Sequence, residues 1–332
     1  MTTTREPAYR ATSADVARRA GVSRATVSQI LNGHGSRFSA ETRDRVTDAA
    51  AELRYRPSPA GRALVKGSSD IVVVVVPDTT YGSNLQDMID RVTEAVERYG
   101  MSVVVRFAGR GSTDTVASIL QFDPWAVVEL GVLSERDLAA LEAAGAVTVP
   151  SRRPSALGDD VNHAFGRMMT EELLRGGPRR LAFAYLADQR LDPYGPERFR
   201  GMALAAAELG LPEPDRLDVP LEITAATAAL ERFVSAGLPV GIGCYNDSVA
   251  IAVLAAGRML GLSVPAELAV VGADATDIGR LVSPRITSVA FDLHRVMDVV
   301  VADLERLHSG TSLEPQRPFA ALRPFVQPGE TT

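Results

Sequence analysis

Three side chains within one short segment have the chemistry needed to read the edges of DNA bases. Arg24 and Ala25 fall in the first turn of an expected helix, and Gln29 follows one turn later. Arginine can donate to guanine O6 and N7 as a fork, glutamine can bridge adenine N6 and N7, and alanine can touch a thymine methyl group. The combination predicts that these side chains contact bases in a major groove.

Short hydroxyl and amide side chains surround these three positions. Such groups suit hydrogen bonds to phosphate oxygens, which fix the register of a protein on a duplex without reading its sequence. The residues predicted to contact phosphates are Thr12, Ser23, Thr26, Ser28, Asn32 and Ser39.

Three expected helices would position these side chains. The first begins with a cap at Ser13 and ends at Gly21, which can adopt the positive φ needed to leave a helix. The second begins after a cap at Ser23 and the third at Ser39, with apolar residues spaced along one face of each. This spacing is that of a helix-turn-helix. The competing interpretation is a small helical hairpin that does not touch DNA.

The charge distribution favours the DNA-binding interpretation. The net charge is −6, but residues 1–66 carry twelve arginines and lysines against six acidic residues, which leaves 23 basic and 35 acidic residues after them. A basic head is attracted to phosphate, while an acidic body stays off the DNA. Such an asymmetry can also arise by chance, so the motif carries more weight than the charge.

Length and composition limit the class of protein to which the chain can belong. A length of 332 residues predicts two or three domains, and 46% hydrophobic residues are ordinary for a globular protein. The longest apolar run, residues 71–77, is far shorter than the roughly 18 residues of a membrane helix, and the N-terminus lacks the apolar core of a secretory signal. Cys244 is the only cysteine, so no intrachain disulfide can form. These features predict a cytoplasmic protein with no membrane partner.

The body of the chain alternates between expected strands and helices. The β-branched run at residues 71–77 is typical of a parallel strand buried on both faces. The alternation restarts near Asp160, which predicts two lobes built on doubly wound parallel sheets. A ligand cleft is expected between the lobes, at the carboxyl ends of their strands.

Motifs for catalysis are missing from the sequence. It holds no G-x-S-x-G, H-E-x-x-H or P-loop pattern, and the G-I-G at residues 241–243 lacks the third glycine of a dinucleotide fingerprint. The four histidines are scattered, and one cysteine cannot form a zinc cluster. The chain is therefore not expected to be an enzyme, nor to hold a cofactor or a metal ion.

Two long motifs in the head carry a resemblance to a known family. T-S-A-D-V-A-R-R-A-G-V-S-R-A-T-V-S-Q-I-L-N-G and V-T-D-A-A-A-E-L-R-Y-R-P-S-P-A-G-R-A-L resemble the LacI/GalR family of bacterial transcription regulators. Y-N-D-S-V-A-I-A-V-L and G-L-S-V-P-A-E-L-A-V-V-G-A-D resemble the periplasmic-binding-protein-like core of the same family. The resemblance implies a helix-turn-helix head joined by a hinge helix to an α/β core of two lobes.

The resemblance also divides the chain into segments. The head would span residues 1–56, and the hinge helix with its linker residues 57–68. The N-terminal lobe would combine residues 69–155 with 291–320, and the C-terminal lobe residues 156–290 with 321–332.

In this family a hinge leucine wedges into the minor groove at the centre of the operator, accompanied by an arginine. These residues match Leu64 and Arg62. An apolar wedge unstacks a base step and kinks the duplex. Gly61 stands where the family usually has alanine, and glycine inside a helix costs about 0.5–1 kcal/mol relative to alanine. We therefore expect a hinge that is harder to order than most.

Three positions that reach the effector in the family match Arg198, Asn246 and Asp274. A carboxylate and an amide can bond vicinal hydroxyls, and arginine adds a fixed fork of donors. Tyr81, in the loop after residues 71–77, is expected to line the cleft and to stack on a ring. Each has a simpler alternative: Arg198 could be solvated, Asn246 could only cap a helix, and Asp274 could only hold a loop.

The resemblance implies a homodimeric repressor that binds a near-palindromic operator and responds to a small molecule between its lobes. A sugar or sugar derivative is the expected effector, in a protein located in the cytoplasm at the nucleoid. The alternatives are a nucleobase or nucleoside effector, an activator role, a solute-binding protein, and an α/β enzyme with an accessory DNA domain. The basic head argues against a solute-binding protein.

Overall fold

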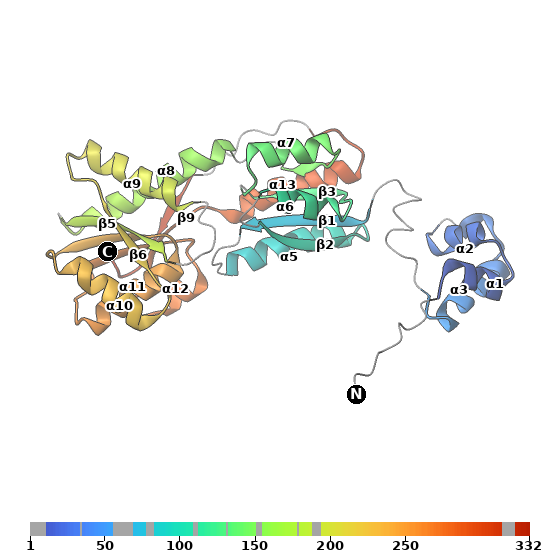
Figure 1. Cartoon of the computed structure of the whole chain (residues 1–332), viewed down its shortest axis with the longest axis horizontal. Coiled ribbons are helices and arrows are strands. Elements are labelled where there is room, and N and C mark those ends of the chain that lie inside the picture. The colour runs from blue at the N-terminus through green and yellow to red at the C-terminus, as the bar shows by residue number, and fades with distance from the viewer. Residues whose placement is uncertain are drawn as a thin grey trace. The chain divides into compact units, whose positions relative to one another are not determined.

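The computed structural model divides the chain into two units, Met1–Asp70 and Ile71–Thr332 (Figure 1). The first unit is called the head below and the second the core. The structure describes residues 11–33, 35–55, 69–77, 83–108, 112–130, 132–150, 155–177, 179–187, 194–313 and 323–332.

The head is helical and its helices begin at polar caps. It contains α1 (Ser13–Ala20), α2 (Arg24–Leu31), a 3₁₀ turn η1 (Gly35–Arg37) and α3 (Ala40–Glu52). Ser23 and Ser39 cap α2 and α3, as predicted from the sequence. The expected cap at Ser13 is wrong, because Thr12 caps α1 and Ser13 is its first residue.

Two local features explain where α1 begins and ends. Thr12 and Asp15 form a reciprocal capping box, in which each side chain accepts the other's backbone N–H. Thr12 and Ser13 are adjacent residues that can both cap a helix. Asp15 lies three residues after Thr12, the spacing that a capping box requires, so Thr12 is the cap. At the other end, Gly21 takes φ 68°, which turns the chain out of α1 as expected.

A small apolar core holds the three helices of the head together. Its buried members come from all three helices: Val16, Ala17, Ala20, Val27, Val46, Ala49 and Ala50. Val22, Ile30, Leu31, Leu53 and Tyr55 pack against this core and remain partly exposed. The inward faces predicted for the helix-turn-helix are therefore the faces that pack.

The first lobe of the core is built on a four-stranded parallel sheet in the order β2-β1-β3-β4. Its elements are β1 (Ile71–Pro77), α5 (Ser83–Glu97), β2 (Ser102–Ala108), α6 (Ser112–Leu120), β3 (Ala126–Glu129), α7 (Glu135–Ala143) and β4 (Thr148–Val149). Alternate valines of β1 belong to two separate apolar clusters, one with α5 and one with α6 and α7. This burial on both faces explains the continuous β-branched run.

The second lobe is built on a six-stranded sheet in the order β10-β9-β8-β7-β5-β6. Its elements are α8 (Ser155–Leu174), β5 (Arg180–Leu186), α9 (Gly195–Glu208), β6 (Asp215–Val219), α10 (Ile223–Val234), β7 (Val240–Cys244), α11 (Asp247–Met259), β8 (Leu268–Ala273), α12 (Asp277–Leu281), β9 (Thr287–Ala290) and β10 (Phe325–Gln327). Five of these strands are parallel, and β10 pairs with β9 in the antiparallel direction.

The sequence interpretation did not mark β6 as a strand or residues 293–308 as a helix, although it assigned residues 291–320 to the first lobe. The edge strand β6 has a mostly exposed surface, so its sequence lacks a buried apolar run. The helix α13 (Leu293–His308) follows β9 of the second lobe but packs on α5 of the first, and the chain then returns to form β10. The chain therefore crosses between the lobes more than once.

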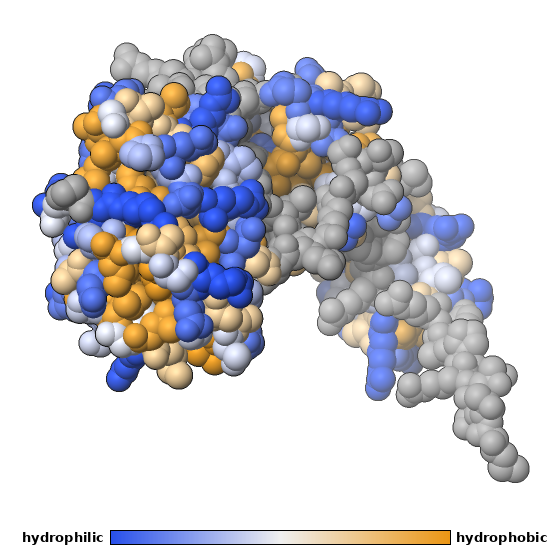
Figure 2. All heavy atoms as spheres, turned by 60° about the vertical axis from the view of Figure 1, so that its left-hand side comes forward, coloured by the Kyte–Doolittle hydropathy of each residue, from blue (hydrophilic) through white to orange (hydrophobic). Residues whose placement is uncertain are grey.

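The surface of the second lobe mixes apolar and charged side chains. Figure 2 shows bands of hydrophilic side chains crossing hydrophobic areas on one face of this lobe. Exposed apolar side chains of its helices include Leu204, Leu209, Ile223, Met259, Ile278 and Leu281. Within the described residues, no helix is long and apolar enough to cross a membrane.

Candidate nucleic-acid interface and effector site

The side chains predicted to read bases lie on the second helix of the head. Arg24 and Ala25 are exposed in the first turn of α2, and Gln29 is half-buried one turn later. The sequence interpretation missed Arg37 of η1, which contacts one of these side chains. Its Nη2 donates a hydrogen bond to Gln29 Oε1. The surface that carries Arg24, Ala25 and Gln29 therefore also includes Arg37 from the turn after α2.

The capping hydroxyls differ in their freedom to donate to a phosphate. Ser23 Oγ accepts the Thr26 N–H at 3.1 Å, and Ser39 Oγ likewise accepts a backbone N–H of α3. Each of these serine oxygens lies 2.9 Å from the hydroxyl oxygen of a neighbouring threonine. Thr12 is different, because its hydroxyl donates to Asp15 Oδ2 at 2.6 Å. Thr12 would have to release Asp15 before it could donate to a phosphate.

Asn32 and Ser28 contact each other at the end of α2. Asn32 is the C-cap residue, and its Nδ2 donates to Ser28 Oγ at 3.2 Å. Its Oδ1 is buried without a hydrogen-bond partner in the described part of the chain. The minor-groove candidates Arg62 and Leu64, and the cleft candidate Tyr81, lie outside the described residues.

In the core, Arg198 is held in a buried position at the start of α9. It is only 4% exposed, which excludes the alternative of a solvated helix residue. Its Nη1 donates to the Tyr245 carbonyl at 2.6 Å, and its Nε donates to Asn162 Oδ1 at 3.2 Å. The guanidinium carbon lies 4.6 Å from the ring centre of Phe165 and 5.4 Å from that of Tyr194. These contacts fix the guanidinium as a rigid fork.

A close crossing of α8 and α9 brings these partners to Arg198. A Cβ on Gly166 would lie 2.1 Å from the Arg198 carbonyl oxygen, and one on Gly201 would lie 2.3 Å from the His163 carbonyl oxygen. Only glycine fits at both positions, so the two helix backbones approach within contact distance. The approach places the Asn162 amide of α8 against the guanidinium of α9.

Asp274 follows β8 and forms an ion pair with Arg198. Its Oδ1 lies 3.8 Å from Arg198 Nη2. Desolvation raises the pKa of the Asp274 carboxyl above its ordinary value, and the nearby positive charge of Arg198 acts in the opposite direction. Asp274 and Ala275 both have positive φ, 90° and 47°, which is uncommon for residues other than glycine. The loop that presents this carboxylate is therefore conformationally strained.

Asn246 lies directly after Tyr245 and caps α11. Its Oδ1 accepts the Val249 N–H at 3.0 Å, and the residue is 5% exposed. The capping alternative is therefore correct for Oδ1. Capping uses the Oδ1 atom of the amide, so it does not exclude a contact between Asn246 and an effector.

Asp247 is a buried carboxylate that the sequence interpretation did not single out. Its Oδ2 accepts from Thr276 N at 2.6 Å and from Thr276 Oγ1 at 2.8 Å, and its Oδ1 accepts from Ser288 Oγ at 2.7 Å. Ser288 Oγ in turn accepts the Ala275 N–H at 2.9 Å. Desolvation raises the Asp247 pKa to about 6 despite these hydrogen bonds. Asp247 thus holds the loop that carries Asp274.

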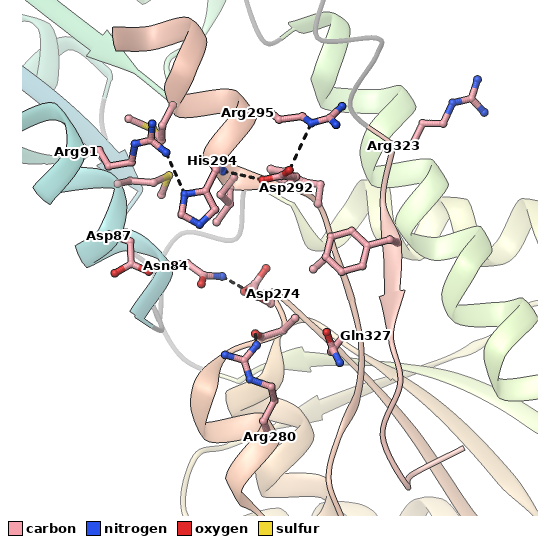
Figure 3. A pocket seen from close by; sticks show the side chains of 17 residues that line it. Asn84, Asp87, Arg91, Asp274, Arg280, Asp292, His294, Arg295, Arg323 and Gln327 are labelled. Atoms are coloured by element: carbon pink, nitrogen blue, oxygen red, sulfur yellow. Dashed lines mark hydrogen bonds and ion pairs between the residues drawn. The ribbon is translucent and has the colours of Figure 1, made fainter. Parts of the chain in front are cut away.

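A contact between the lobes reaches the same loop. Asn84 of α5 donates from Nδ2 to the Asp274 carbonyl oxygen at 2.7 Å (Figure 3). Desolvation raises the pKa of Tyr194 in the second lobe, and the positive charge of Arg198 acts against it. Glu129, buried at the end of β3 in the first lobe, and Asp274 each raise this pKa further. Groups of both lobes therefore act on the Arg198–Asp274 region.

A cavity of about 590 Å³ opens beside this contact. It is lined by α5, the loop after β8, the start of α13 and the segment around β10, and Figure 3 shows the Asn84 side chain pointing toward Asp274. Of the predicted effector residues that the structure describes, only Asp274 lines this cavity; Arg198 and Asn246 are buried and do not line it. Among the described residues no group of three or more His, Cys, Asp or Glu is placed to hold a metal ion.

Comparisons with known proteins match both units. Residues 12–58 match the family described as bacterial regulatory proteins, lacI family, and residues 170–332 match a periplasmic binding protein-like domain. The HTH-type transcriptional regulator AscG of Escherichia coli is 26% identical over 326 residues, which are 93% of this chain and 95% of AscG. The regulator GalS of Salmonella typhimurium is 29% identical over 84% of each chain.

Solved structures share the fold. The lac repressor dimer bound to operator and the anti-inducer ONPF is 21% identical, covers 97% of this chain and 99% of its own, and has a TM-score of 0.72.

A helix-turn-helix head and a periplasmic-binding-protein-like core together define a DNA-binding transcription regulator. The sequence motifs, the fold and the curated relatives agree on a narrower assignment. The chain belongs to the LacI/GalR family of bacterial transcription regulators. Its relatives are regulators and not enzymes, in agreement with the sequence prediction.

Proposed function

We propose that the protein is an effector-responsive repressor that binds a near-palindromic operator as a homodimer. A sugar or sugar derivative bound between the lobes changes the affinity for the operator. The observation that carries this proposal is the buried Arg198 guanidinium fixed 3.8 Å from Asp274, in a region that groups of both lobes reach. The protein would act in the cytoplasm at the nucleoid.

The head supplies the DNA contacts in this proposal. Arg24, Ala25 and Gln29 read base edges in the major groove, and the short polar side chains around α2 hold phosphates. Arg62 and Leu64 act in the minor groove, where the hinges of the two subunits meet. The segments would be those expected from the sequence: head 1–56, hinge and linker 57–68, and two lobes of discontinuous sequence.

The effector contacts would come from the second lobe, with Tyr81 of the first lobe stacking on a ring. The Asp274 carboxylate accepts from hydroxyls, the Arg198 fork and the Asn246 Nδ2 group donate, and Asn246 Oδ1 caps α11. Such a set suits adjacent hydroxyl groups. Arg198 already donates to Tyr245 and Asn162, so it would act as a rigid wall of the site with its remaining donors.

A ligand screen with the full chain tests this function. Sugars and nucleosides are tested one by one for a shift of the melting temperature, and each hit is then added to a titration of a duplex selected from a random pool. We expect a hit that changes duplex affinity by about 5- to 150-fold, the usual size of coupling between sites. A nucleoside hit in place of a sugar would favour the alternative effector class.

Variants show whether the ligand uses the proposed residues. Asp274→Asn and Asn246→Ala are expected to keep duplex binding and to lose the response to the ligand. The matched control is Asp277→Asn, which alters an exposed acid three residues away that pairs with Arg280. A normal response in both site variants would place the effector elsewhere and contradict the proposal.

A further inference from the structure

The turn after α2 sends one arginine back onto the helix proposed to read DNA. Arg37 lies in η1, is exposed, and donates from Nη2 to Gln29 Oε1. Its guanidinium carbon also lies 5.1 Å from the ring centre of Phe38. Two polar side chains from different elements therefore form a single unit on the surface of the head.

The position of Arg37 is set by packing of the turn as well as by Gln29. Gly35 is buried, and a Cβ there would lie 3.4 Å from the Ile30 Cα of α2 and 3.3 Å from the Arg43 Cδ of α3. Phe38 N donates to the Gly35 carbonyl at 3.0 Å, and Arg43 Nη1 donates to the Phe38 carbonyl at 2.8 Å. The turn is thus fixed on both helices, with Arg37 between two anchored residues.

This contact changes what Gln29 can offer to a base. A glutamine that bridges adenine accepts from N6 through its oxygen and donates to N7 through its nitrogen. Here Oε1 already accepts from Arg37, which engages one of the two lone pairs of that oxygen, so the Nε2 donors become the more available end of the Gln29 amide. Arg37 has five N–H donors and uses one of them in this bond, so the Arg37–Gln29 pair presents mainly donors, from both side chains. Guanine is the base whose major-groove edge carries two acceptors, O6 and N7.

We propose that Arg37 is a further specificity-determining residue and that the Arg37–Gln29 unit reads guanine. This inference rests on the proposed docking of α2 in the major groove. It differs from the expectation drawn from sequence, which assigned Gln29 to adenine by itself. Two other roles are tested alongside it: a phosphate contact by Arg37, and a surface pair that takes no part in binding.

The test measures base preference with the full chain. A duplex is selected from a random pool, and binding is measured by fluorescence anisotropy for all four base pairs at every position. The unmodified protein is expected to prefer guanine at the position that Gln29 reads, by about 5- to 150-fold. Replacing that guanine with 7-deazaguanine removes the N7 acceptor and is expected to weaken binding.

Substitution of Arg37 gives the decisive result. In Arg37→Ala the Gln29 amide is free to bridge N6 and N7, so the preference at this position is expected to change from guanine to adenine. Adding Gln29→Ala is expected to abolish preference there. Arg37→Lys keeps the charge but not the fork, so it is expected to lose guanine preference while the salt dependence of binding stays unchanged.

Two outcomes would overturn the inference. If Arg37→Ala weakens all sequences equally and the slope of log K against log salt falls by about 0.9, Arg37 contacts a phosphate. If Arg37→Ala binds every duplex as before, the pair has no role in reading. The control Arg19→Ala removes the same charge from an exposed arginine that pairs with Glu52 of α3, and it should leave base preferences unchanged.

Arg24→Ala and Arg37→Ala together distinguish a wrong role for Arg37 from a wrong docking of α2. If Arg24→Ala changes the preference at its own base position while Arg37→Ala changes none, only the role of Arg37 is wrong. If neither variant changes any preference although both fold, as judged by circular dichroism, α2 does not read the major groove.

Discussion

The Asn84 side chain of the first lobe donates to the Asp274 carbonyl oxygen of the second lobe at 2.7 Å. The carboxylate of the same aspartate lies 3.8 Å from Arg198. One residue therefore takes part in a contact between lobes through its backbone and in the proposed effector site through its side chain. A ligand that moves this carboxylate would also move the carbonyl that Asn84 holds, which offers a short physical route from ligand binding to the angle between lobes.

Asn84→Ala is expected to leave duplex binding without effector close to normal and to change the size of the effector response. A neutral hydrogen bond contributes about 0.5–1.5 kcal/mol, so the ratio of duplex affinities with and without effector should change by up to about tenfold. Duplex titrations at saturating and zero effector measure it. Asp87→Ala, on the same helix and lining the same cavity, serves as control. An equal change in both variants would show that the cavity wall matters and the hydrogen bond does not.

Asp247 should make stability depend on pH. Its pKa rises from an ordinary 3.8 to about 6 in the folded protein, so the folded state binds a proton more tightly than the unfolded state. The contribution of Asp247 to the unfolding free energy is therefore greatest below about pH 4 and falls as pH rises to about 6, by an amount on the order of 3 kcal/mol. Urea unfolding across this range is compared with Asp247→Asn, which should lack that component. Parallel curves for the two proteins would contradict the assignment.

Gly201→Ala should disrupt the crossing of α8 and α9. Its Cβ would lie 2.3 Å from the His163 carbonyl oxygen, so the helices must separate and Arg198, three residues earlier, must shift. We expect a loss of unfolding free energy of about 1–3 kcal/mol and a weaker effector response. Leu204→Ala, at a 47% exposed position on the same helix, should stay within about 0.5 kcal/mol. A stable Gly201→Ala protein with a normal response would refute the argument.

Arg24→Ala should relax base preference at one position of the selected duplex. A bidentate arginine–guanine contact is worth about 1–3 kcal/mol of discrimination, and the loss should be confined to that base pair. A base-substitution series measures it, with Arg18→Ala on α1 as the control for a lost exposed charge. Selectivity that survives at every position would remove Arg24 from the reading surface.

Sequence alone determined the features that depend on neighbouring residues. The caps at Ser23 and Ser39, the turn at Gly21 and the buried run of β1 each follow from the preferences of a few consecutive residues. The helix-turn-helix head and the two-lobed parallel architecture could therefore be predicted. The cap of α1 was misplaced by one residue, because Thr12 and Ser13 have similar propensities and only the capping box with Asp15 separates them.

Tertiary structure decided the contacts between residues far apart in the chain. Asn84 and Asp274 are 190 residues apart, and Asp247 reaches a loop 29 residues further along. The edge strands show the same limit, since the antiparallel pairing of β10 depends on β9 being in place. Arg37 and Gln29 are only eight residues apart, yet their contact depends on how the turn packs against α2 and α3. Local propensity sets where a helix or strand forms, whereas side-chain partners are selected only when burial brings distant segments together.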